Sequence, residues 1–192
     1  MNLRSLLMSA VLMLAAGSAL AQTTNLALTG TIASVDGRKL SVKADGDGAE
    51  QVMTLAPNAG VYVSKPATLA DIHATDYVAS AALKGMDGKL HSTELRIWPD
   101  SLRGLGEGQF AMNDARQQTM TNATVTGSAI VGSSNNLTVT FKGATSELVV
   151  DPGVPVSKVE QVEVGVLKPG VRVRVGGTKG AEGAVVVRVF VQ

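Results

Sequence analysis

Near the end of the chain, apolar and polar residues alternate with the period of a β-strand. Segment 171–175 reads V-R-V-R-V, so one face of the predicted strand is apolar and the other is charged. In segment 185–191 valines again occupy alternate positions, but the residues between them are also half apolar. An open edge strand that is apolar on both faces promotes aggregation. We therefore expect barrel closure to cover one face and the other half of the chain to cover the second.

The first half of the chain shows the same alternation, interrupted by turn signals at 36–37, 45–48 and 85–88. Before the fourth predicted strand, Thr68 and Asp71 have the spacing of a capping box and indicate a single helical turn. A short extended piece is expected at 61–63, after the pair Pro57–Asn58 closes the third strand. The predicted strands are 26–35, 40–44, 51–55, 77–83 and 90–98.

The second half of the chain repeats this order. Leu40 and Val42 recur as Leu137 and Val139, 97 positions later, and the other landmarks recur at offsets between 93 and 97. The offset drifts only at turns. Two unrelated valine-rich β segments could resemble each other by chance, but a steady offset favours an internal duplication.

Five short strands with a helical turn between the third and the fourth are typical of an OB-type barrel. The sequence therefore predicts an all-β protein made of two tandem five-stranded OB-like barrels, joined by an irregular glycine-rich linker. The predicted boundaries are a signal peptide at 1–21, a first barrel at 22–98, a linker at 99–121 and a second barrel at 122–192.

The N-terminal segment has the pattern of a secretory signal peptide. Arg4 precedes an apolar run at 6–16, and Ala19–Leu20–Ala21 forms an A-x-A cleavage site. The run is shorter than the ~20 residues that span a bilayer, and a buried N-terminal helix is the alternative interpretation. We expect export to the periplasm with cleavage after Ala21. The chain has no cysteine, so neither a disulfide nor a lipidated cysteine is expected.

Composition narrows the possible partners. The chain is 45% hydrophobic and 17% charged, which is globular composition. Cleavage would remove Arg4 from the 17 basic residues, leaving 16 against 16 acidic residues. A neutral surface with only 3% aromatic residues does not favour nucleic-acid binding. The expected partner is an envelope protein or a small ligand, with no nucleic acid and no membrane insertion after cleavage.

The longest stretch without strand or helix periodicity runs from Trp98 to Val125. It contains the only tryptophan and three glycines at alternate positions, at 104, 106 and 108. Their spacing differs from that of phosphate-binding loops, and no amphipathic helix follows them. A structural connector is therefore the expected role. Within this stretch Trp98, Arg103 and Glu107 are the candidates for contact with a ligand or partner, and Trp98 is the expected wedge between the barrels.

The sequence offers little for catalysis. The chain has no cysteine that could act as a nucleophile. Its two histidines, His73 and His91, are the only possible imidazole bases, and neither lies in a nucleophile motif. Solvated loop histidines are the simpler interpretation. We expect a non-enzymatic binding or accessory protein that uses no cofactor.

Weak handling of copper or another divalent metal is the alternative function. Thioether sulfur favours Cu(I), and imidazole suits several transition metals. The candidate ligands are His73, His91, Met112 and Met120, with Asp71, Asp76 and Glu94 as possible carboxylate neighbours of the histidines. None of the methionines has the tight spacing of a copper motif.

Several of these segments resemble one family. The runs T-G-T-I-A-S-V-D-G-R-K-L-S-V-K, T-L-A-D-I, E-L-R-I-W-P-D-S-L-R-G-L-G-E-G and T-M-T-N-A-T-V are similar to exported proteobacterial proteins with tandem small OB-like domains of unknown function. The resemblance covers most of the mature chain and implies no catalytic or binding residues. Some members are labelled metal transporter permeases, which would require several membrane spans that this sequence does not predict.

Overall fold

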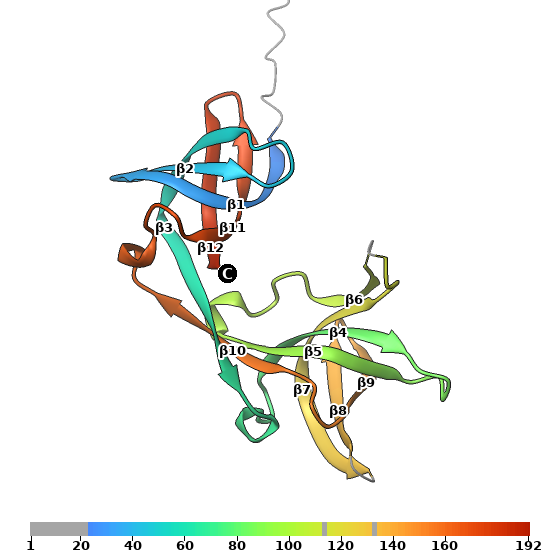
Figure 1. The fold of residues 1–192 in the computed structure, drawn as a ribbon. Helices are drawn as coiled ribbons and strands as arrows, with labels where there is room; N and C mark the ends of the chain where they lie inside the picture. Colours follow the sequence, from blue (N-terminus) through green and yellow to red (C-terminus); the bar gives the residue numbers. More distant parts are fainter. Residues whose placement is uncertain (1–22, 113–114, 132–133) are drawn as a thin grey trace, which may run out of the picture.

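The computed structural model describes residues 23–112, 115–131 and 134–192. These residues form a 12-stranded sheet with three short 3₁₀ helices, so the predicted all-β class is confirmed. The predicted signal peptide at 1–21 lies outside the described residues. Figure 1 shows two groups of strands, joined by the long strand β3 and by β10.

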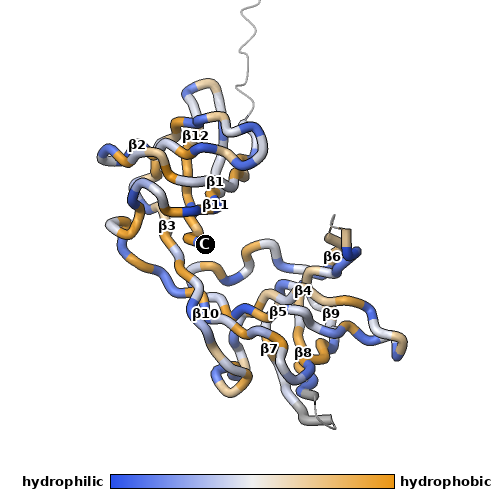
Figure 2. The backbone as a smooth tube through the Cα atoms, in the orientation of Figure 1, coloured by the Kyte–Doolittle hydropathy of each residue, from blue (hydrophilic) through white to orange (hydrophobic). Residues whose placement is uncertain are grey.

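The strands follow the apolar–polar alternation of the sequence, which is visible along the tube in Figure 2. The three 3₁₀ helices are η1 (Leu69–Asp71), η2 (Asp100–Leu102) and η3 (Val164–Val166). The strands are β1 (Thr24–Asp36), β2 (Lys39–Ala44), β3 (Glu50–Ala67), β4 (Tyr77–Lys84), β5 (Leu90–Trp98), β6 (Gly108–Ala111), β7 (Thr119–Val131), β8 (Ser134–Phe141), β9 (Ala144–Val150), β10 (Val156–Val162), β11 (Arg172–Gly180) and β12 (Gly183–Val191).

The local signals that separate the first strands are confirmed. Gly37, between β1 and β2, has φ 54°, and Gly46, between β2 and β3, has φ 90°. Glycine adopts such angles without the steric cost that other residues incur. Thr68 and Asp71 also interact as predicted, because the Asp71 carboxylate accepts hydrogen bonds from the Thr68 N–H and Oγ, both at 2.8 Å.

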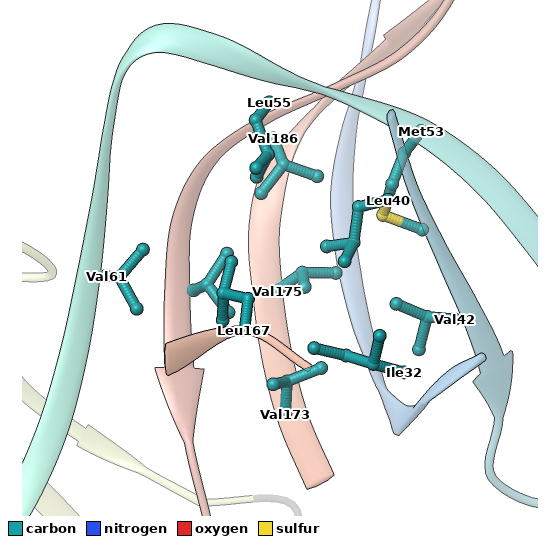
Figure 3. Close-up of a cluster of buried hydrophobic side chains, with 11 residues drawn as sticks. Ile32, Leu40, Val42, Met53, Leu55, Val61, Leu167, Val173, Val175 and Val186 are labelled. Atoms are coloured by element: carbon teal, nitrogen blue, oxygen red, sulfur yellow. The ribbon is translucent and has the colours of Figure 1, made fainter. Parts of the chain in front are cut away.

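One closed barrel, called barrel I here, consists of β1, β2, β3, β11 and β12. The strands pair in the order β12–β11–β1–β2–β3, and a parallel pairing between β12 and β3 closes the ring. Figure 3 shows the aliphatic side chains that fill it, and burial of this apolar surface stabilises the barrel. They are Ile32, Leu40, Val42, Met53, Leu55, Val61, Leu167, Val173, Val175, Val186 and Val189.

Five of the seven remaining strands, β4, β5, β7, β8 and β9, form a second ring, called barrel II. They pair in the order β5–β4–β7–β8–β9, and a short parallel contact between β5 and β9, at Leu90–Leu148 and His91–Val149, completes the ring. Strand β6 pairs with β7 from outside. Its hydrophobic core cluster consists of Val78, Leu95, Ala123, Val125, Leu137, Val139, Leu148 and Val150, together with Val156 of β10.

The prediction that residues 22–98 and 122–192 form separate barrels is wrong. Each ring combines three strands of one half of the chain with two strands of the other half. Barrel I contains β1, β2 and β3 of the first half, and barrel II contains β7, β8 and β9 of the second half. Thus β11 and β12 complete barrel I, whereas β4 and β5 belong to barrel II. The two halves have the same local pattern, so each can accept the other's last two strands.

The length of β3 explains the exchange. A break at Pro57–Asn58 was predicted, but β3 continues through it for 18 residues. A strand of this length spans ~60 Å at about 3.3 Å per residue, more than one small barrel can contain. Its first part pairs with β2 in barrel I, and residues 61–67 pair with β10. The chain therefore leaves barrel I before β4 begins.

Strand pairing supports the duplication. The parallel pair Val61–Val189 in β3 and β12 has its counterpart in Val156–Leu95 of β10 and β5, at offsets of 95 and 94. The β-bulges also correspond, since the register of β1 and β2 shifts after Ile32 and that of β7 and β8 shifts after Val125. The antiparallel pair of β3 and β10 relates the two halves by an approximate two-fold axis. Equivalent strands therefore make equivalent contacts in both rings.

One predicted face requires correction. The valines at alternate positions over 185–191 were expected to share one face, but the pairing of β12 with β3 shifts between Val186 and Arg188. The shift reverses the alternation, so Val186 and Val189 are fully buried while Val185 is 41% exposed. The predicted cover on the second face is confirmed at Phe190, which packs outside barrel I.

Candidate functional site

The two barrels meet at a small cluster of aromatic and aliphatic side chains, called the junction cluster. Phe190 of β12 stacks on Tyr62 of β3, with ring centroids 5.2 Å apart. Trp98, at the end of β5, approaches Phe190 at 6.1 Å and Tyr77 edge-on at 6.3 Å. Leu102, Leu105 and Val159 complete the cluster. Trp98 thus lies between the barrels, as predicted from its place at the end of a strand.

The segment after Trp98 is more regular than predicted. The expected irregular linker at 99–121 contains η2, β6 and the start of β7. Gly104, Gly106 and Gly108 all have positive φ, at 79°, 61° and 140°. The glycines at alternate positions are therefore explained by backbone geometry that other residues rarely adopt.

This segment is anchored on the outer face of barrel II. Tyr77 donates a hydrogen bond from its hydroxyl to the Leu105 carbonyl at 3.1 Å, and Asn122 donates from Nδ2 to the Gly106 carbonyl at 2.9 Å. Burial raises the pKa of Tyr77 to about 12, and the charge of Glu107 adds to the rise. The phenol therefore stays protonated and remains a donor across the physiological pH range.

A hollow of about 510 Å³ opens beside the junction cluster and is called the junction hollow. Its volume lies within the range of small-molecule sites. Four segments that are distant in the sequence form its wall: β3, η2 with the turn that follows it, β10 and β12. The lining residues are Asn58, Gly60, Tyr62, Ser101, Leu102, Arg103, Gly104, Leu105, Gln161, Val187 and Arg188.

Backbone constraints shape the floor of the junction hollow. A Cβ atom at Gly60 would lie 2.3 Å from the Tyr62 hydroxyl, so any larger residue there would displace that ring. The Tyr62 hydroxyl lies 3.4 Å from Ser101 Oγ, which links β3 to the turn of η2. The hydroxyl groups of Tyr62 and Ser101 therefore lie together on the wall.

Two arginines give the junction hollow its charge. Arg103 donates to Asp100 from Nη2 at 2.7 Å, so its charge is partly balanced by a neighbour outside the wall. Arg188 is half-buried, and no partner for its guanidinium is found among the described residues. It pairs across the sheet with Gly176 on one side and Gly60 on the other, and neither of these partners carries a side chain. The lining residues include no carboxylate.

The three residues predicted to contact a ligand or partner take different positions in the structure. Trp98 belongs to the junction cluster and Arg103 to the wall of the junction hollow. Glu107 accepts a hydrogen bond from the Lys142 N–H at 2.9 Å, which fastens the segment to the turn between β8 and β9. The wall residues contributed by β3, β10 and β12 were not predicted, because nothing in their local pattern indicates that these strands meet.

Among the predicted metal candidates, the two histidines lie on separate elements and the two methionines share one hairpin. His73 follows η1 and lies 3.8 Å from Asp76 through Nδ1, whereas His91 is on β5. Met112 and Met120 belong to the β6–β7 hairpin, where the Met112 N–H donates to the Gln118 carbonyl. Within residues 23–112, 115–131 and 134–192, no group of three or more histidine and acidic side chains is placed to hold a metal ion.

His91 has partners that differ from the one expected. Its Nδ1 lies 2.7 Å from Asp151, and its Nε2 lies 3.2 Å from Asp87, while Glu94 binds Arg96 instead. The hydrogen bond with Asp151 raises the pKa of His91 above 6.5, and Asp87 adds to the rise. The imidazole thus bridges the turn after β4 and the segment after β9.

This bridge predicts a pH dependence. Folding raises the pKa of His91, so its stabilising contribution is fully present below the unfolded pKa of about 6.5 and is lost as pH rises through the folded pKa. We expect the stability difference between wild type and Asp151→Asn to shrink as pH rises from about 6. Chemical denaturation across this range measures it.

An NMR titration of the His91 ring supplies the control. Asp151→Asn should lower the pKa of His91, whereas Asp76→Asn, which changes the neighbour of His73, should leave it unchanged. Equal pKa values of His91 in wild type and Asp151→Asn would contradict the bridge.

Compared with protein-family models, with curated proteins and with solved structures, the chain matches none of them. Among the helices of the described residues, none has the length and apolar character needed to cross a membrane.

Proposed function

We propose that this protein is a non-enzymatic binding or accessory module of the bacterial periplasm, and that the junction hollow is its binding site. The observation that carries the proposal is the convergence of Asn58, Tyr62, Ser101, Gln161 and Arg188, from four segments, on one hollow. Amide, hydroxyl and guanidinium groups bind and orient a ligand through several hydrogen bonds. A guanidinium stays protonated near neutral pH and is a poor general acid or base, so this wall suits binding better than acid–base catalysis.

The periplasmic location and the OB type of the barrels belong to the same proposal. The A-x-A site after an apolar run supports export. In barrel I, β1, β2 and β3 pair in sequence and β3 pairs in parallel with β12. In barrel II, β7, β8 and β9 pair in sequence and β9 pairs in parallel with β5. This arrangement supports an OB-like barrel. The site proposed here nevertheless lies between the barrels and not on the strand face that OB folds commonly use.

A variant that fills the junction hollow tests the proposal. Gln161 is exposed on β10 and lines the hollow, so Gln161→Trp should place an indole in it without disturbing a core. Thr178→Trp, at an exposed position of β11, is the matched control. The mature chain would be screened by thermal shift and calorimetry against neutral, cationic and anionic small molecules and short peptides.

We expect at least one of these classes to bind saturably to wild type and to Thr178→Trp, and to lose binding in Gln161→Trp. Saturable binding that Gln161→Trp leaves intact would place the site elsewhere. A failure of every class to bind wild type would also overturn the proposal.

A further inference from the structure

We infer that the junction hollow selects small molecules that carry an oxyanion, either a carboxylate or a phosphate group, and that Arg188 is the residue that recognises it. The inference rests on the proposed function, because it assigns a ligand class to the same site. It begins from the charge of the wall, which contains Arg103 and Arg188 but no carboxylate.

Arg188 is the stronger candidate of the two arginines for binding an anion. Arg188 as a residue is half-buried, and a cation in such a position is stabilised by an anion or by hydrogen-bond acceptors. Two other arginines have carboxylate partners, since Arg172 binds Asp45 at 2.6 Å and Arg96 binds Glu94 at 3.1 Å. For Arg188, none is found in the described part of the chain.

The surroundings of Arg188 leave it accessible to a ligand. It lies between Gly176 of β11 and Gly60 of β3 in neighbouring strands. A Cβ atom at Gly176 would lie 3.8 Å from Nε and Nη2 of Arg188, so the guanidinium extends across that strand. The planar fork of a guanidinium matches the two oxygens of a carboxylate or phosphate group.

Other polar groups that line the junction hollow would hold the rest of such a ligand. Ser101 and Tyr62 present hydroxyl groups 3.4 Å apart, and Asn58 and Gln161 present amides on the same wall. Hydroxyls and amide N–H groups donate to oxyanions, whereas the amide and hydroxyl oxygens accept from hydroxyl or amino groups of a ligand. The wall is therefore complementary to a small, polar, negatively charged molecule.

Another hollow in the described residues lacks this feature. It has a volume of about 410 Å³ and is lined in part by Lys84, Lys89 and Glu147. Lys89 lies 3.9 Å from Glu147, so opposite charges already meet there. An anion would compete with a carboxylate in this hollow, which makes the junction hollow the better anion site.

The test uses calorimetry of the mature chain with four probes: succinate, inorganic phosphate, glycerol phosphate and the neutral dimethyl ester of succinate. Arg188→Gln removes the charge and the fork, while Arg188→Lys keeps only the charge. Arg174→Gln is the matched control, because it removes the same charge from an exposed position of the neighbouring strand. Arg103→Gln tests the other arginine of the lining in case Arg188→Gln perturbs folding.

We expect at least one anionic probe to bind wild type, and the neutral ester not to bind. Arg188→Gln should weaken binding by about tenfold to a hundredfold, the usual effect of losing charged hydrogen bonds. Arg188→Lys should weaken it less, Arg103→Gln should also weaken it, and Arg174→Gln should leave it unchanged. A preference for succinate or for the two phosphates would identify which oxyanion is the ligand.

Three results would overturn the inference. Equal anion binding by wild type, Arg188→Gln and Arg103→Gln would exclude the two arginines as the recognition groups. Binding of only neutral or cationic molecules, abolished by Gln161→Trp, would refute the ligand class and leave the proposed function standing. If no class responds to Gln161→Trp, both proposals fail.

Discussion

Residues 23–112 and 115–192, produced as separate fragments, will not fold into stable barrels alone, and their mixture will form a folded one-to-one complex. Each fragment supplies only three strands of one ring and two strands of the other. A barrel without two of its five strands exposes apolar core and unpaired backbone groups, which are both unfavourable in water. Association restores every strand pairing of barrels I and II.

Circular dichroism and light scattering of each fragment and of the mixture measure this outcome. The mixture should unfold cooperatively, and its mass should equal one copy of each fragment. Mixing either fragment with a second preparation of itself provides the control for nonspecific association. A fragment of residues 23–112 that unfolds cooperatively as a monomer would contradict the strand exchange and restore the tandem arrangement.

Trp98→Ala will lower the free energy of unfolding by about 3 kcal/mol, near the lower end of the range for loss of a buried aromatic ring. The ring contacts Phe190 from barrel I and Tyr77 from barrel II, so its removal leaves a cavity where the barrels meet. The value is at the lower end because Trp98 is only half-buried. Chemical denaturation followed by circular dichroism measures the change.

Two further variants make this result specific. The indole Nε1 of Trp98 is buried and has no hydrogen-bond partner among the described residues, so Trp98→Phe keeps an aromatic ring while removing a costly donor. Its effect should stay within about 1 kcal/mol. Phe110→Ala, at an aromatic residue of β6 that is 49% exposed, should also cost little. A loss in Trp98→Ala no larger than in Phe110→Ala would contradict a structural role at the junction.

Strand exchange and the proposed site depend on each other. The wall of the junction hollow combines β3 and β12 of barrel I with the turn after η2, which is anchored to barrel II through Tyr77. In separate tandem barrels these segments would belong to different bodies. The junction hollow therefore requires both halves of the chain to be assembled.

The sequence by itself determined the features that depend on local physical chemistry. Alternation of apolar and polar residues located β5 at its observed bounds and placed the turns at Gly37 and Gly46. The steady offset between the halves predicted the repeat that the pairings of Val61 and Val156 display. Each of these features is set by neighbouring residues, or by comparing one half of the chain with the other.

Only the tertiary structure decided which strands pair. The two halves share one pattern, so the pair β4–β5 and the pair β11–β12 meet the same local requirements for completing a ring. Which pair completes which ring is therefore decided by contacts between residues far apart in the sequence. It follows from the uninterrupted course of β3 through Pro57–Asn58. That course also brings Tyr62, Arg103 and Arg188 to one hollow, since residues far apart in sequence converge only when the strand pairing is set.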